Sequence, residues 1–423
     1  MHTVLNRVTE NWQAVVLVAV WMVAHILIVV PLIKERWGSI AILFIGILLA
    51  LCYLIKPFTY DLPKYSLYFD YSSLAVEGYT RTSSGEIILA ETDRDGPFCP
   101  FGSTNWGSKG FCTTIALSRQ VMPKGSWLLP RMLPGPYVSD SLMIVVVLIG
   151  LGCMLIAVKF LFDEISRAPP FLSQLLYAIP FLLGSTFFFV GSQNSVRQFL
   201  AIVMILSAIG LAFANRRIWA LIFSVGALTM HQWGWMLIMP ALLGILWVGL
   251  LEKYHEKLRG REILATVIFP LGLGVIGVGV LTATASIFQD NHFWGELGTY
   301  LTGKINDDPF RSNVVGKVGF IGLMFLASEW VIGKVESRAI LRVQWMRRIL
   351  FFLILPLAYY EAIFSRLLYL YFGLETLLII GLWMLGDLRR RIAAGIIFIS
   401  YSLTPNVLRI LVGLSNWKAL LYG

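Results

Sequence analysis

This sequence has few charged residues. Only 14% of its 423 residues are charged, against about 25% in ordinary soluble domains, and 57% are hydrophobic. This composition excludes an ordinary soluble protein. The N-terminus lacks a cationic start and a small-residue cleavage site, so we expect no cleaved signal peptide. No internal repeat is evident, which argues against the inverted-repeat transporters.

Cysteine is also scarce, with four residues in the chain. Cys52 and Cys153 lie within apolar runs, where we expect buried and inert thiols. Cys99 and Cys112 share one polar loop, which can hold a disulfide if that loop is extracytoplasmic. A metal site is not favoured there, because no nearby histidine or second cysteine pair completes it.

The net charge is +10, from 34 basic and 24 acidic residues. The basic residues cluster in short loops between apolar runs, as the positive-inside rule predicts. No basic, aromatic-interleaved patch lies on a soluble unit. We therefore expect the membrane lipid as a partner and no nucleic acid.

Apolar runs long enough to cross a membrane recur along the whole chain, at roughly 20 residues for each spanning helix. They predict an all-α polytopic membrane protein, with residues 1–423 forming a single membrane domain. About twelve such runs are present. The expected spans are 12–33, 38–55, 139–162, 171–191, 196–214, 217–231, 235–251, 263–287, 317–333, 348–363, 367–385 and 392–412.

Lysine and arginine set the expected orientation. The following residues lie in one set of alternate loops, which we assign to the cytoplasm: Lys34 and Arg36; Lys159 and Arg167; Arg216 and Arg217; Lys253, Lys257, Arg259 and Arg261; Lys334, Arg338, Arg342, Arg347 and Arg348; and Arg389, Arg390 and Arg391. Both termini then lie outside, with two extracytoplasmic loops at 56–138 and 288–316. The first is too long for a plain connection and is expected to be a folded cap or a substrate lid.

A helical hairpin organises the chain. Its first helix opens after Gln193-Asn194-Ser195, its turn is a short basic segment at 214–217, and its second helix closes at His231. Arg197, Gln198 and His231 therefore lie at a similar depth. They form either a polar site at one membrane face or a snorkelling arginine with an interfacial histidine, and the spacing leaves both open.

The topology brings other polar groups to the same outer face: Lys56, Asp61 and Tyr65 after the second span, and Glu361, Arg366 and Tyr369 at the turn between the tenth and eleventh spans. Arginine presents a planar fork to phosphate oxygens, and Asp or His can accept a proton from a sugar hydroxyl. The alternatives are local ion pairs of Asp61 with Lys64 and of Glu361 with Arg366, and tyrosines of the interfacial aromatic belt.

These residues resemble a known family. The segment QNSVRQFLAIVMILSAIGLAFANRRIWALIFSVGALTMHQWGWM is similar to the central motif of the EpsG-like bacterial exopolysaccharide and O-antigen polymerases, within the Wzy class. FTYDLPKYSLYF resembles the family's Asp-Tyr…Tyr segment, and EAIFSRLLYLYF its late Arg…Tyr helix start. This sequence departs from the family pattern at Lys56, where an Arg-rich segment is usual, at Gln232-Trp233 after the histidine, and at Ser365 before Arg366.

The resemblance implies a membrane glycosyltransferase, compatible with a GT-C-like fold, that joins undecaprenyl-pyrophosphate-linked repeat units at the periplasmic face of the bacterial inner membrane. It implies neither metal nor cofactor, and a chain-length regulator and a flippase as partners. We expect catalysis from Asp61, Arg197 and His231, with Asp61 or His231 as the base. The expected substrate contacts are Lys56, Tyr65, Asn194, Gln198, Gln232, Glu361, Arg366 and Tyr369. The alternatives are another lipid-glycan transferase or ligase, and a lipid-glycan flippase.

Overall fold

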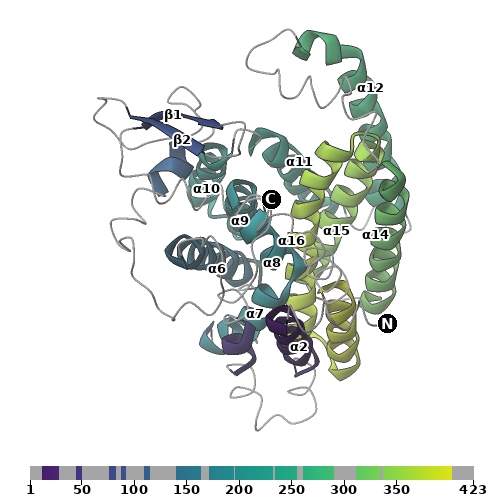
Figure 1. The fold of residues 1–423 in the computed structure, drawn as a ribbon. Helices are drawn as coiled ribbons and strands as arrows, with labels where there is room; N and C mark the ends of the chain where they lie inside the picture. Colours follow the sequence, from purple (N-terminus) through teal and green to yellow (C-terminus); the bar gives the residue numbers. More distant parts are fainter. Residues whose placement is uncertain are drawn as a thin grey trace.

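The fold is a bundle of helices in which one helix, α9, lies at the centre (Figure 1). The computed structural model describes residues 12–27, 44–49, 76–81, 87–91, 109–114, 140–162, 171–194, 196–231, 234–254, 261–289, 311–333 and 337–402. Its helices are α2 (Trp12–Leu27), α6 (Asp140–Phe162), α7 (Phe171–Gly184), α8 (Thr186–Asn194), α9 (Val196–Phe213), α10 (Arg217–Met230), α11 (Gly234–Lys253), η3 (Leu264–Ile268), α12 (Phe269–Gln289), α14 (Arg311–Ile332), α15 (Arg338–Ile354), η5 (Leu355–Tyr359) and α16 (Glu361–Leu385). A further helix covers 388–402.

Helix α9 contacts α6, α8, α10, α11 and α16. Of its 18 residues 83% are buried, against 17% in the span Leu264–Thr284 at the edge of the bundle. Gly210 lets α9 approach α6 closely, because a Cβ there would lie 3.1 Å from the Cα of Ala157. Ser207 donates a 2.7 Å hydrogen bond to the carbonyl of Cys153 on α6. Small residues and one hydroxyl thus hold the central pair of helices together.

The α9–α10 hairpin forms as the sequence predicts. Asn215 adopts a left-handed conformation with φ 58°, which asparagine tolerates better than most residues. The amide of Arg216 then donates to the carbonyl of Leu211 at 2.8 Å, closing the end of α9. Helix α10 begins at the next residue and packs along α9. The start of α9 and the end of α10 therefore return to the same end of the bundle.

The composition and burial of the helices suit a membrane. Five described helices are long and apolar enough to cross one, and Arg217–Met230 and Val318–Trp330 are shorter apolar helices. Large apolar side chains are exposed along α10, α11 and α12, as lipid-facing surfaces require. The prediction of a helical membrane protein is confirmed, whereas the count of twelve spans stays a prediction.

Two strands interrupt the helical pattern within the described residues. β1 (Val76–Arg81) and β2 (Ile87–Glu91) pair antiparallel, with an irregularity between Val76 and Gly78. Both belong to the long segment 56–138 expected to form a cap. That segment therefore contains a hairpin of its own.

The tenth expected span, 348–363, was placed incorrectly. Helix α15 covers Arg338–Ile354, the chain turns through η5, and α16 begins at Glu361. Arg342 and Arg347, assigned to a cytoplasmic loop, are 7% and 0% exposed inside the bundle. The segment is a helix because acidic side chains on neighbouring helices neutralise its arginines. Pro356 lies in the first turn of η5, where the helical path changes.

Candidate functional site

Three helix ends meet at one end of the bundle. Arg197 is the second residue of α9, His231 directly follows α10, and Arg366 is the sixth residue of α16. His231 has extended backbone angles and is 8% exposed. Arg197 lies close enough to His231 for its charge to act on the imidazole, which agrees with the predicted proximity of the two residues, whereas their depth in a membrane stays a prediction. Arg366 lies at the same end of the bundle. It belongs to the second turn of α16 and not to a connection between two spans, where the sequence analysis placed it.

The electrostatics of this end centre on His231. Burial lowers the pKa of His231 well below its ordinary value, and the positive charges of Arg197 and Arg366 lower it further. The imidazole is therefore neutral at neutral pH. A neutral imidazole beside two guanidinium groups can accept a proton while the arginines hold an anion.

Gln198 joins α9 to α16 at this end. Its side chain is 5% exposed, and its Nε2 donates a 2.9 Å hydrogen bond to the carbonyl oxygen of Arg366. A pocket lies beside this bond, with an empty volume of about 270 Å³ that includes its open mouth. The residues that line it are Gln198, His231, Met236, Leu237, Ile363, Arg366 and Leu367. Three polar residues thus border a pocket whose walls are mainly apolar.

Part of the long segment 56–138 covers the same end of the bundle. Residues 109–114 are helical, and Gly110 lies so close to the Thr229 side chain of α10 that a Cβ would not fit. Phe111 is 1% exposed within the main apolar core. Cys112 is disulfide-bonded, and Cys153 is a free buried thiol. Thr229 is two residues before His231, so the segment 109–114 packs close to the candidate site.

Several predicted site residues lie outside the described residues: Lys56, Asp61, Tyr65, Cys99, Gln232 and most of the loop 288–316. Asn194 ends α8 and Glu361 begins α16, but their side chains are not described. Tyr369, which is described, does not line the pocket. Its ring lies edge-on to that of Phe372, one turn further along α16. The structure thus brings together Arg197, Gln198, His231 and Arg366 from the predicted set.

A family model described as the EpsG family matches residues 140–410, about two thirds of the chain. The chain belongs to the EpsG family. The match includes α6 to α16 and with them all four residues that meet at the candidate site. No curated protein and no solved structure matches the chain.

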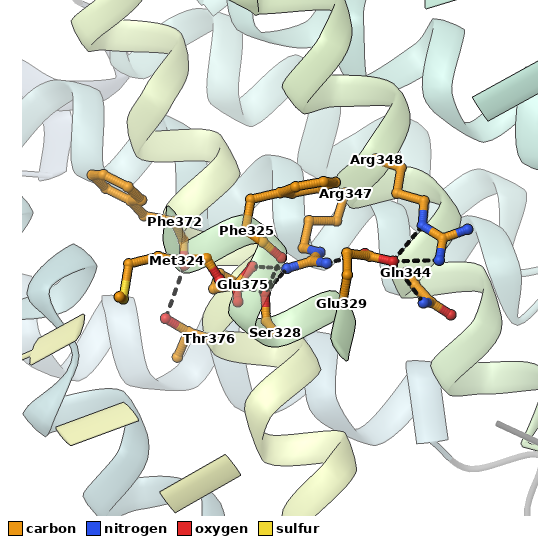
Figure 2. Close-up of polar contacts among 10 residues, drawn as sticks. All are labelled: Met324, Phe325, Ser328, Glu329, Gln344, Arg347, Arg348, Phe372, Glu375 and Thr376. Atoms are coloured by element: carbon orange, nitrogen blue, oxygen red, sulfur yellow. Dashed lines mark hydrogen bonds and ion pairs between the residues drawn. The ribbon is translucent and has the colours of Figure 1, made fainter. Parts of the chain in front are cut away.

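The EpsG-family region also holds a buried charge cluster that the sequence reasoning missed (Figure 2). Arg347 lies between two carboxylates: it donates to Glu375 at 2.6 Å and pairs with Glu329. It also donates to Ser328 and lies 4.7 Å from the centroid of the Phe325 ring. Glu329 further accepts from Arg348 and from Gln344. The cluster joins α14, α15 and α16 in the interior.

One sequence signal could have revealed this cluster. Glu375 is the fifteenth of the 25 residues of α16 and lies in an otherwise apolar stretch. A carboxylate inside a spanning helix requires a partner that is buried with it. The arginines at 342, 347 and 348 were the available cations, but their density favoured a loop. Among the described residues, no group of His, Cys, Asp and Glu side chains has the composition of a metal site.

Proposed function

We propose that this EpsG-family protein is a polysaccharide polymerase, a glycosyltransferase that joins lipid-pyrophosphate-linked oligosaccharide repeat units. The observation that carries the proposal is one pocket lined by His231 and Arg366, with Arg197 close enough for its charge to act on the imidazole. Family membership supports a role in membrane polysaccharide synthesis. The undecaprenyl carrier, the bacterial inner membrane and the assistance of a flippase and a chain-length regulator belong to the same proposal.

The proposed reaction needs no metal or cofactor. The hydroxyl oxygen of a repeat-unit acceptor attacks the anomeric carbon of the donor chain, and the bond from that carbon to the pyrophosphate oxygen breaks. Arg197 and Arg366 hold the pyrophosphate as its negative charge grows, because guanidinium groups keep their charge when partly buried. His231 takes the hydroxyl proton, a role for which its neutral state suits it. Asp61 is the other candidate base.

Two features support an active site on the extracytoplasmic side. The positive-inside pattern assigns the α9–α10 turn at Arg216 and Arg217 to the cytoplasm, which puts the opposite end of the hairpin outside. The segment 109–114, which packs on α10 near His231, contains the disulfide-bonded Cys112. Disulfides persist in oxidising compartments. We propose Cys99 as the partner of Cys112.

A transporter is less well supported by the distribution of charge. Inverted-repeat transporters carry polar sites near mid-membrane in corresponding positions of both halves. Here the cluster around Arg347 lies in α14 to α16. Within the described helices α6 to α11, charged residues lie only in the first or last turn. A ligase that moves finished glycans would share the pyrophosphate site, so its product must distinguish it.

The test is the glycan ladder of cells deleted for this protein and complemented with wild type or Arg197→Ala. The proposal predicts that wild type restores long chains and that the variant leaves single repeat units. If both proteins restore long chains, Arg197 is not needed for polymerisation and its role is structural. Deletion that leaves the ladder intact while another glycan is lost or trapped inside would favour the ligase or the transporter.

A further inference from the structure

Helix α16 carries both Arg366 of the candidate site and Glu375 of the buried cluster. Nine residues separate them, which is about 13.5 Å along the axis and about half a turn beyond two full turns. The two side chains therefore leave α16 on opposite faces. Arg366 reaches the pocket beside α9 and α11, and Glu375 reaches Arg347 on α15. The cluster holds α16 from the side away from the site.

Two contacts restrain α16, one on each side. At its start, Gln198 of α9 donates to the carbonyl of Arg366 at 2.9 Å. Near its middle, Arg347 of α15 donates to Glu375 at 2.6 Å, with both side chains at most 1% exposed. A shift of one residue along α16 would move its side chains by about 1.5 Å and rotate them by about 100°. With one contact alone, α16 could still rotate about that contact. The two contacts together fix both the depth of α16 in the bundle and its rotation about its own axis.

The arginine in the second contact is itself held from outside α16. Arg347 pairs with Glu329 of α14 and donates to Ser328 (Figure 2). Glu329 also binds Arg348 and Gln344, the neighbours of Arg347 on α15. At the start of α15, Arg338 and Arg342 bind Glu252 of α11 at 2.8 and 2.6 Å. The contacts with Glu252 hold the start of α15, whereas the Arg347 guanidinium itself is positioned by its own helix and by its contacts with α14.

Stability alone is a poor reason for such a cluster. Replacing a buried ion pair by well-packed apolar side chains is often neutral or stabilising, since desolvation offsets the attraction between the charges. An ion pair differs from an apolar contact in its directionality, and its best-attested use is to fix one register among several. Helix α16 packs against its neighbours largely through apolar side chains, which are non-directional, so an ion pair is well suited to fix its register.

We infer that the ion pair of Arg347 with Glu375 positions Arg366 beside His231 by fixing the depth and rotation of α16. Glu375 and Arg347 are thus positioning residues for the proposed transferase and touch neither substrate nor reacting atoms. The activity readout of this inference rests on the proposed function, but its structural readout does not.

The structural readout is the imidazole NMR signal of His231 in the purified full-length protein, assigned among only five histidines. Glu375→Leu removes the contact with α16, while Arg347 keeps Glu329 as a partner. The signal of His231 should shift, because the charge of Arg366 that it senses has moved. Glu375→Gln, which keeps an acceptor oxygen, should give a smaller shift. Glu252→Leu removes the two ion pairs that join Arg338 and Arg342 of α15 to α11, keeps the contact of Arg347 with Glu375, and should leave the signal unchanged.

The activity readout is a double-mutant cycle of polymer formation with lipid-pyrophosphate-linked repeat units. Glu375→Leu should lower activity by about tenfold to a hundredfold, since small misplacements cost this much. In an Arg366→Gln background the same substitution should change the residual activity by less than about twofold, because two changes that act through one residue do not add. Glu375→Gln should regain part of the loss.

Three results would overturn the inference: an unmoved His231 signal in both Glu375 variants, an equal shift in Glu252→Leu, or fully additive losses in the cycle. If Glu375→Leu does not accumulate, Glu375→Gln decides by the same criteria. Full activity in Arg366→Gln contradicts the proposed function instead. In that case the His231 signal still tests the positioning of α16.

Discussion

Arg347→Leu should destabilise the protein far more than the loss of any one hydrogen bond. Arg347 has no exposed surface, and it faces Glu375, which is 1% exposed. Removing the guanidinium leaves that carboxylate buried without its cation, a change that costs about 3–5 kcal/mol in other proteins. Glu329 is spared, because it keeps Arg348 and Gln344 as donors. The loss of stability in Arg347→Leu therefore comes from the unpaired carboxylate of Glu375.

This cost can be converted to a melting temperature. An unfolding entropy of about 2.1 cal/mol/K for each residue gives about 0.9 kcal/mol/K for a chain of this length. The expected decrease in Tm for Arg347→Leu is therefore about 3–6 °C. Thermal unfolding of the detergent-solubilised protein, followed by the loss of its monodisperse peak, measures the decrease.

Two further variants make this prediction discriminating. Glu375→Leu should lower Tm less than Arg347→Leu, because Arg347 keeps Glu329 as a counter-charge. The double variant Arg347→Leu with Glu375→Leu should recover most of the loss, since no carboxylate then stays unpaired and apolar side chains fill similar volume. A double variant less stable than Arg347→Leu, or equal losses in both single variants, would refute this reasoning.

Other predictions concern the candidate site. Arg197→Lys should lose most polymer formation despite keeping its charge, because a lysine cannot bind phosphate bidentately; full activity in glycan ladders would contradict this. If His231 is the base, it must be unprotonated to act, so activity should fall as His231 becomes protonated. Because its pKa is lowered, kcat/KM should begin to fall only below pH 6.5, and a fall at or above that pH would argue against His231 as the base. Reducing a bridge between Cys99 and Cys112 should change mobility on a non-reducing gel, whereas freely labelled thiols at both positions would exclude the bridge.

The sequence predicts those elements whose ends carry local signals. Asn215 and the two arginines after α9 marked a turn between apolar runs, and the polar residues before Val196 marked the start of α9. The hairpin therefore followed from local sequence. The nearness of its two ends also followed, because any two-helix hairpin returns its ends to one face. The meeting of Arg197 and His231 required no knowledge of the remaining helices.

Contacts between residues that are far apart in the sequence could not be predicted from local patterns. The arginines of α15 resemble a cytoplasmic loop until Glu329 and Glu375, 18 and 28 positions away from Arg347, are placed beside them. Their burial depends on how α14 and α16 pack against α15, which apolar periodicity does not specify. The bond from Gln198 to the Arg366 carbonyl, 168 positions apart, is of the same kind. Gln198 was expected to touch substrate, and the structure gives it a contact that holds α16.

The central claim is that Arg197, Arg366 and His231 form one polymerising site. Its most direct test uses the purified protein in lipid nanodiscs with an undecaprenyl-pyrophosphate-linked repeat unit, resolving the products by length. The account predicts a ladder of products with wild type, only a small residue of product with Arg366→Gln, and an unchanged ladder with Arg338→Gln, an exposed arginine at the other end of the bundle. A full ladder from Arg366→Gln, or equal loss from Arg338→Gln, would contradict it.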